Sequence, residues 1–227
     1  MLRFMSLRGS GCVIERMINP GKRFHPPGFL AVRPLDLLAF FLAIAYSGTL
    51  SQIPTELYKD FGNYLIYAEG SWPRLQRMLN QGVLPTLANE PVWLLLNSIM
   101  GSFLEPETVV RTMIFVSGSV VAWLALRRRP EHFVWLLIFL LIPTVLKNHV
   151  LHLRQGVAIA VFSWVWFSPN RIVSAILMAL TPFIHASFFF ILAIFWSAKL
   201  MINARLGPVI CIMLFVALGV TLSFGLK

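Results

Sequence analysis

Long apolar runs with few charged residues follow one another along most of this chain. Of the 227 residues, 58% are hydrophobic and only 12% are charged, whereas soluble domains are about 45–50% apolar and about 25% charged. An α-helix needs about 20 mainly apolar residues to cross the hydrocarbon core of a bilayer. The composition therefore predicts an all-α fold, a polytopic transmembrane helical bundle.

Seven of the apolar runs are expected to cross the membrane, and prolines separate several of them because proline resists helix interiors. The predicted spans are roughly residues 35–50, 108–126, 132–149, 154–168, 171–185, 186–201 and 206–225. A further run at 91–104 would form a helix of only about 21 Å at 1.5 Å per residue. This length is less than the hydrocarbon thickness of about 30 Å, so we predict a short re-entrant or interfacial helix there.

Cations flank the apolar runs unevenly, and cytoplasmic loops of membrane proteins carry an excess of Lys and Arg. The cations before the first run and between two later runs are Arg3, Arg8, Arg16, Lys22, Arg23, Arg33, Arg127, Arg128 and Arg129. Residues 1–30 are therefore predicted to be a basic cytoplasmic N-terminal tail. Residues 31–227 are predicted to form a single integral membrane domain with an outer loop at 51–107.

Several functional classes lack support in the sequence. The net charge of +10 follows the topological pattern and forms no soluble basic face, so we expect no nucleic-acid partner. Cys12 and Cys211 lie far apart and suggest no disulfide framework. His149 and His152 have no third ligand at helical spacing, whereas catalytic zinc usually has three protein ligands, so no metal is expected. No dinucleotide, P-loop or nucleophile-elbow motif predicts a cofactor or those reaction classes.

The predicted topology gathers polar residues on the outer side of the membrane. Lys147, Arg154 and His185 all fall at outer ends of predicted spans. Six of the nine carboxylates belong to the predicted outer loop: Glu56, Asp60, Glu69, Glu90, Glu105 and Glu107. A channel or an inert scaffold gives no reason for this asymmetry, so we expect chemistry at the outer face.

Arg154 and His185 border apolar runs, where ionisable side chains cost roughly 2.5–3.5 kcal/mol on insertion scales and usually face a polar cavity. Arginine suits phosphate because its planar fork binds phosphate oxygens in bidentate geometry. Lys147 precedes Arg154 by seven residues and would share its face on a continuous helix. The alternative for both cations is snorkelling to lipid headgroups.

Histidine is the side chain whose unperturbed pKa of about 6.5 suits a base near neutral pH, which makes His185 a candidate base. Its alternative role is a buried histidine that hydrogen-bonds a neighbouring helix. Glu90 precedes Pro91 and is a candidate site acid, although an acid followed by proline is also an ordinary helix start.

Asp60, Tyr64 and Tyr67 would share one helix face at i, i+4 and i+7. Such a face of carboxylate and aromatic rings suits contact with carbohydrate. The alternative is an interfacial helix, because Tyr and Trp favour the headgroup level.

The ordered set of these motifs resembles the EpsG-like branch of the Wzy-type polysaccharide polymerases over about residues 35–200. The motifs are the Asp60/Tyr64 region, Glu90-Pro91 before Leu-Leu-Leu-Asn, Leu153-Arg154-Gln155-Gly156-Val157-Ala158, and Ile184-His185-Ala186-Ser187. Members of that family are usually longer, so this chain is expected to be a fragment, a truncated copy or a compact relative.

The resemblance implies a multi-pass enzyme of the bacterial inner membrane that joins undecaprenyl-diphosphate-linked oligosaccharide repeat units on the outer face, to make exopolysaccharide or O-antigen. It implies that Arg154 holds the diphosphate and that His185 and Glu90 are active-site groups. We therefore take His185, Glu90 and Asp60 as candidate catalytic residues. The candidate substrate-binding residues are Arg154, Gln155, Lys147, Tyr64 and Tyr67. Membrane lipids and other polysaccharide-assembly proteins are the expected further partners.

Three functions follow from these observations. The first is glycosyl transfer from an undecaprenyl-diphosphate donor, with His185, Glu90 or Asp60 as the base. The second is a flippase or transporter for a lipid-linked glycan, although no internal repeat of the kind common in transporters is present. The third is an inactive partner subunit of a larger glycosyltransferase.

Overall fold

All regular structure in the described part of the chain is helical, as predicted. The computed structural model describes residues 34–54, 60–128, 132–168 and 170–203, with Ile210, Met213 and Val216, leaving aside the side chains of Arg171 and Ile202. The helices are α2 (Pro34–Ser51), α3 (Phe61–Gln81), α4 (Val83–Ala88), α5 (Pro91–Gly101), α6 (Pro106–Arg128), α7 (Phe133–Leu140), α8 (Pro143–Val150), α9 (Leu153–Phe167), α10 (Arg171–Ile184) and α11 (Phe188–Asn203). The predicted tail at 1–30 lies outside the described residues, as does most of the predicted span at 206–225.

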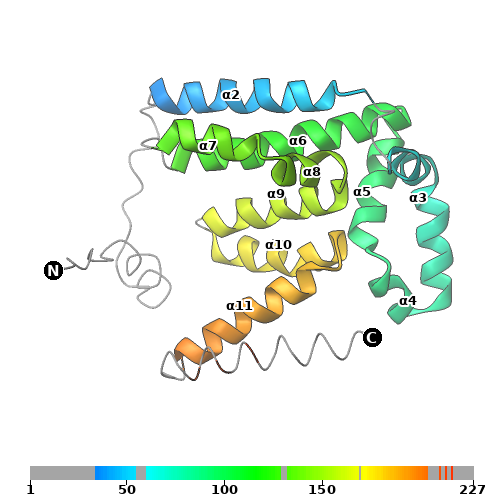
Figure 1. Ribbon diagram of the computed structural model, residues 1–227. Coiled ribbons are helices and arrows are strands. Elements are labelled where there is room, and N and C mark those ends of the chain that lie inside the picture. Colours follow the sequence, from blue (N-terminus) through cyan, green and yellow to red (C-terminus); the bar gives the residue numbers. More distant parts are fainter. Residues whose placement is uncertain are drawn as a thin grey trace.

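α2 and α6 are long and apolar enough to cross a membrane, and they lie side by side (Figure 1). Small residues on α2 allow this close approach, which is the usual basis of helix packing in lipid. Ala39, Ala43 and Ser47 repeat every four residues on α2 and are buried. On α6, a Cβ on Gly118 would lie only 2.9 Å from Ser47 Oγ.

Fewer than seven helices in the described residues are long enough to cross a membrane, so the predicted number of spans is not reached. α7 and α8 together qualify as one further candidate, but a bend of 59° separates them. α5, α9, α10 and α11 are apolar and shorter. The 15 residues of α9 reach about 22 Å at 1.5 Å each. The described chain therefore provides two clear candidate spans, or three with the bent pair.

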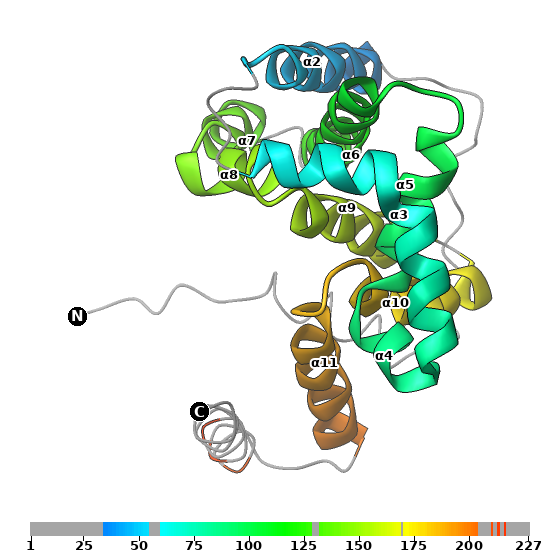
Figure 2. The same ribbon diagram turned by 90° about the vertical axis from the view of Figure 1, so that its right-hand side faces the viewer.

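The segment predicted as an outer loop, 51–107, is largely helical. α3 contains Pro73 and departs from helical geometry at Gly70, and proline in a helix interior is a usual cause of such a kink. α5 occupies most of the run at 91–104 and begins at Pro91, as a proline in the first turn favours. α3 packs closely on α5 because Gly101 lacks a Cβ, which would collide with the carbonyl oxygen of Ala68. Figure 2 shows α3 and α4 on the side of the molecule that faces the viewer.

A break between α8 and α9 positions the start of α9. α8 ends at Val150 and α9 begins at Leu153. The Tyr64 hydroxyl of α3 donates to Leu151 O and accepts from Leu153 N–H, both at 3.0 Å. One buried tyrosine thus satisfies two backbone groups that the break would leave unpaired.

Gly156 sets how closely α9 approaches α8. An added Cβ would lie 2.5 Å from Asn148 O and 3.2 Å from His149 Cα, both backbone atoms that can move only with α8. We expect Gly156→Ala to lower the free energy of unfolding by about 1–3 kcal/mol, as overpacking does. Thermal unfolding of the purified protein in detergent would measure the loss.

Gly48→Ala is the matched control, because nothing lies within 4 Å of its added Cβ. Equal melting temperatures for the two variants would contradict the proposed close contact between α8 and α9.

Candidate active site

Glu90 occupies an unusual backbone position at the start of α5. It has φ 53° and is the only non-glycine residue with positive φ in the described part of the chain. A left-handed conformation costs a non-glycine residue of order 1–3 kcal/mol and persists only when the surrounding structure holds it. The side chain is 11% exposed. A buried carboxylate on a strained backbone makes this position a functional candidate.

Three donors from distant parts of the chain converge on the Glu90 carboxylate. Arg154 Nη1 donates to Oε2 at 2.5 Å, and the backbone N–H of Ala186 donates to Oε1 at 3.0 Å. His185 Nδ1 lies 3.0 Å from the same Oε1. The structure therefore brings together the start of α9, the end of α10 and the start of α5, and with them Arg154, His185 and Glu90.

These donors control the charge of Glu90. Burial raises the pKa of the carboxyl group, but the hydrogen bonds from His185, Ala186 and Arg154 and the positive charge of Arg154 outweigh it, so the pKa lies below its ordinary value. Glu90 precedes α5, outside the helices long enough to span a membrane. The carboxylate therefore stays ionised and is a weak base, which suits a positioning group better than a proton acceptor.

The same contacts orient the His185 ring. An ionised carboxylate only accepts hydrogen bonds, so Nδ1 carries the proton that faces Glu90. In neutral imidazole the lone pair is then on Nε2, and Nε2 has no hydrogen-bond partner within the described residues. The His185 side chain is 27% exposed. His185 is thus arranged as a base whose second nitrogen is not engaged by the described residues.

Arg154 lies in the first turn of α9, where the helix dipole disfavours a cation. Its ion pair with Glu90 compensates for this position. The guanidinium also lies over the Tyr67 ring, 5.4 Å from the centroid, and its side chain is 35% exposed. Because the fork carries five N–H donors, it can bind an anion in addition to Glu90.

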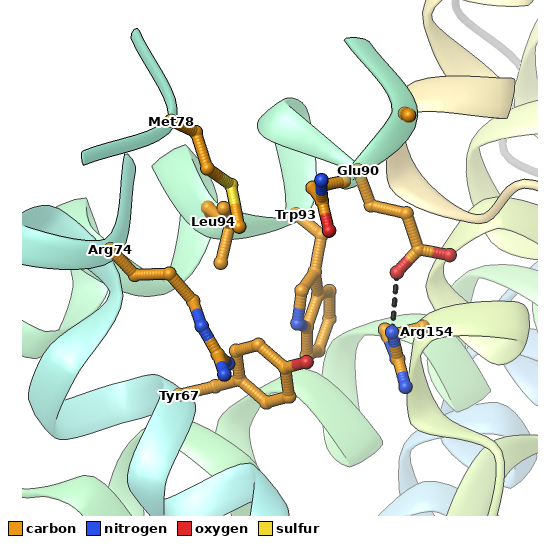
Figure 3. Close-up of a pocket in the computed structure, with 9 residues that line it drawn as sticks. Tyr67, Arg74, Met78, Glu90, Trp93, Leu94 and Arg154 are labelled. Atoms are coloured by element: carbon orange, nitrogen blue, oxygen red, sulfur yellow. Dashed lines mark hydrogen bonds and ion pairs between the residues drawn. The ribbon is translucent and has the colours of Figure 1, made fainter. Parts of the chain in front are cut away.

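A cavity of about 280 Å³ opens beside the Glu90–Arg154 pair, between α3, α5 and α9 (Figure 3). Its lining residues are Tyr67, Arg74, Met78, Ala88, Asn89, Glu90, Trp93, Leu94 and Arg154. Tyr64 and Tyr67 both contact the buried Trp93 edge to face. The Nε1 donor of Trp93 is buried and has no hydrogen-bond partner among the residues that the structure describes.

Sequence analysis missed Arg74 as a site residue. Arg74 lies on α3, seven residues after Tyr67, and its guanidinium is 5.0 Å from the centroid of that ring. The i+7 spacing that links Asp60, Tyr64 and Tyr67 extends to Arg74 if the helix continues, so the signal was present in the sequence. Figure 3 shows Arg74 and Arg154 on either side of the Tyr67 ring.

The other candidate residues, among them His185, are not part of the lining of this cavity. Asp60 is the N-terminal capping residue of α3, and Tyr64 is buried with its hydroxyl bound to the α8–α9 break. Gln155 is half-buried in the first turn of α9, and Lys147 is exposed on α8. The break at 151–152 removes the continuous helix that the spacing of Lys147 and Arg154 assumed. Within the described ranges, no group of three or more His, Cys, Asp and Glu residues is arranged to hold a metal ion.

Tyr64→Phe should destabilise the α8–α9 break. The substitution removes the hydroxyl that pairs with Leu151 O and Leu153 N–H, and the loss of such buried bonds costs about 1–3 kcal/mol. Thermal unfolding in detergent would measure it. Tyr67→Phe is the control on the same helix because no hydrogen bond of the Tyr67 hydroxyl is found among the described residues. An equally small effect of both changes would show that the Tyr64 hydroxyl does not hold the break.

Stability should depend on pH through Glu90. Its pKa is lower in the folded protein than the unfolded value of about 4.3. Its contribution to stability is therefore fully present above the unfolded pKa and is lost as pH falls through the folded pKa. Melting temperatures of the wild type and Glu90→Gln, measured in detergent between about pH 3 and pH 7, should differ most at neutral pH and converge in acid. A difference that does not depend on pH would contradict an ionised Glu90.

Comparison with known proteins identifies the family of this chain. The model of the EpsG family matches residues 37–226, which is more than half of the chain. No curated protein matches the chain, and no solved structure matches it. The matched range contains Glu90, Arg154 and His185. The chain thus belongs to the EpsG family, and with its apolar helices it is a membrane protein related to polysaccharide biosynthesis.

Proposed function

We propose that this protein is a membrane polymerase that joins lipid-diphosphate-linked oligosaccharide repeat units into a longer polysaccharide. The observation that carries the proposal is the Glu90 carboxylate, which binds Arg154 through one oxygen and His185 through the other. The cation for a departing diphosphate lines the cavity, and the base for an attacking hydroxyl, which is not itself among the lining residues, is bound to the other oxygen of the same carboxylate. Undecaprenyl diphosphate is the proposed lipid carrier, in keeping with the family.

In the proposed reaction, an acceptor sugar hydroxyl attacks the anomeric carbon of the donor sugar. The new bond joins the acceptor oxygen to this carbon, and the bond between the carbon and the diphosphate oxygen breaks. His185 Nε2 takes the hydroxyl proton, and the lipid diphosphate leaves with the bonding electrons. Glu90 holds Nδ1 of the same ring, so it stabilises the imidazolium that forms.

Arg154 stabilises the negative charge that grows on the diphosphate. Interactions that strengthen as charge develops lower the barrier, whereas interactions equal in both states do not. The pairing with Glu90 and the contact with Tyr67 restrict the guanidinium before the substrate binds. This preorganisation reduces the cost of ordering a long side chain during the reaction.

The proposed orientation places the cavity on the outer face of the bacterial inner membrane. Arg128 contacts the end of α9, where its guanidinium binds Phe167 O at 3.3 Å and lies over the Phe167 ring. Arg154 is at the other end of the same helix. The positive-inside rule places the Arg127–Arg128 end in the cytoplasm, so the opposite end faces outward. A cytoplasmic N-terminus and crossings by the shorter helices, up to seven spans, are parts of this proposal.

Arg154→Ala should abolish chain elongation while the protein still inserts. The loss of one charge-stabilising donor typically lowers the rate about 10²–10³-fold. Arg154→Lys should restore elongation only partly because it keeps the charge without the planar fork. A glycan ladder from a deletion strain, complemented with each variant at equal membrane abundance, would measure chain length. Lys199→Ala, an exposed cation on α11, is the control. Wild-type chain length in the Arg154→Ala strain would exclude the proposed role.

Synthesis in vitro separates a polymerase from a transporter or a partner subunit. Purified protein with lipid-linked repeat units in detergent should make longer lipid-linked oligomers without another protein. Product formation should fall in His185→Ala. Failure to elongate in detergent, together with movement of the same units across vesicles, would instead support a flippase.

A further inference from the structure

A second cavity extends the candidate active site along α3. Its volume is about 230 Å³, and its lining residues are Arg74, Arg77, Met78 and Gln81. Arg74 and Met78 also line the first cavity, so the two cavities share part of their lining along α3, and together we call them the groove. From Arg74 to Gln81 the helix rises roughly 10 Å at 1.5 Å per residue. The groove is therefore longer than a site for a single phosphate group.

The groove carries more positive than negative charge. Arg74, Arg77 and Arg154 line it, and Glu90 is the only carboxylate among its lining residues. The Glu90 carboxylate is already bound by the side chains of Arg154 and His185 and by the backbone N–H of Ala186. Arg74 and Arg77 form no ion pair within the described residues. Arg77 uses Nε for a bond to Pro73 O, which leaves the outer guanidinium nitrogens to a ligand.

The polar neighbours of these cations suit a saccharide. The Asn89 side chain donates one amide N–H to Pro85 O at 2.7 Å. Its oxygen accepts no hydrogen bond from the described residues, so it can accept one from a sugar hydroxyl. Gln81 offers an exposed amide at the far end of the groove. Amides together with arginines can bind sugar hydroxyls and a carboxylate at the same time.

We propose that Arg74 and Arg77, with Asn89 and Gln81 beside them, form a subsite for an acidic sugar of the repeat unit, one that carries a carboxylate. The inference rests on the proposed function because it names the glycan that the same site would accept. Arg154 lines the first cavity and marks the end of the groove where transfer takes place. The saccharide extends from there along α3, and its carboxylate pairs with Arg74 and Arg77.

Binding of soluble oligosaccharides tests this subsite without any turnover. The protein, purified in neutral detergent, is titrated with an oligosaccharide that contains glucuronate and with the same oligosaccharide after reduction of its carboxyl groups. The acidic form should bind about fivefold more tightly, the difference expected for one charged contact in a partly exposed site. The preference should weaken as salt is raised.

Substitutions of the groove arginines test whether these residues cause the preference for the acidic oligosaccharide. Arg77→Gln should remove most of the preference for the acidic oligosaccharide, whereas Arg77→Lys should retain most of it. Arg74→Gln together with Arg77→Gln should remove it entirely. Lys199→Gln lowers the charge by the same amount on a different helix and should preserve it.

Equal binding of the acidic and reduced oligosaccharides would overturn the proposal. So would an Arg77→Gln variant that keeps the preference, or one that instead loses retention of anionic phospholipid, which would make these arginines headgroup contacts. A different result, normal chain elongation in the Arg154→Ala strain, would contradict the proposed function. A carboxylate preference that persists in that case would leave the saccharide subsite standing.

Discussion

The pairing of one buried carboxylate with three donors organises the candidate site. A buried charge is tolerated only when it is paired and hydrogen-bonded, and Glu90 receives Arg154, His185 and the Ala186 N–H. These donors come from the start of α9 and from the segment after α10, while Glu90 itself precedes α5. Its left-handed backbone is strained, and this pairing offsets the strain. Three helix termini thus meet at one side chain.

The sequence predicted the helices well wherever an apolar run was bounded by proline or by charge. α2, α6, α9 and α10 match predicted runs within a few residues. The meeting of Arg154 with His185 was also expected, because both fall at span ends on one predicted face. Their pairing with a single carboxylate was not expected from any sequence pattern. Such a contact depends on how α5 is placed against α9 and α10, and no local pattern encodes that placement.

The segment between α2 and α6 shows where local patterns were insufficient. α3 is amphipathic and includes charged residues, so hydropathy placed it in an outer loop between spans, and only the spacing of Asp60, Tyr64 and Tyr67 indicated that part of this loop could be helical. Its burial depends on tertiary contacts, such as the close approach of Ala68 and Gly101 and the Tyr64 bonds to the α8–α9 break. The same break separates Lys147 from Arg154, which the seven-residue spacing had placed on one face. Arg74 joins the site through the extension of α3 beyond Tyr67.

Glu90 contacts both Arg154 and His185. In the proposed mechanism, this shared carboxylate couples binding of the diphosphate at Arg154 to proton transfer at His185. When Arg154 binds an anionic diphosphate, its donors are divided between the phosphate oxygens and Glu90. The carboxylate then has less positive charge near Oε2, and its negative charge acts more fully on His185 through Oε1. A nearby negative charge favours the imidazolium, so in the proposed mechanism the carboxylate stabilises the charge that His185 acquires when it takes the hydroxyl proton. In this arrangement, the presence of the leaving group at Arg154 prepares His185 for proton transfer, and Glu90 transmits the effect without accepting a proton itself.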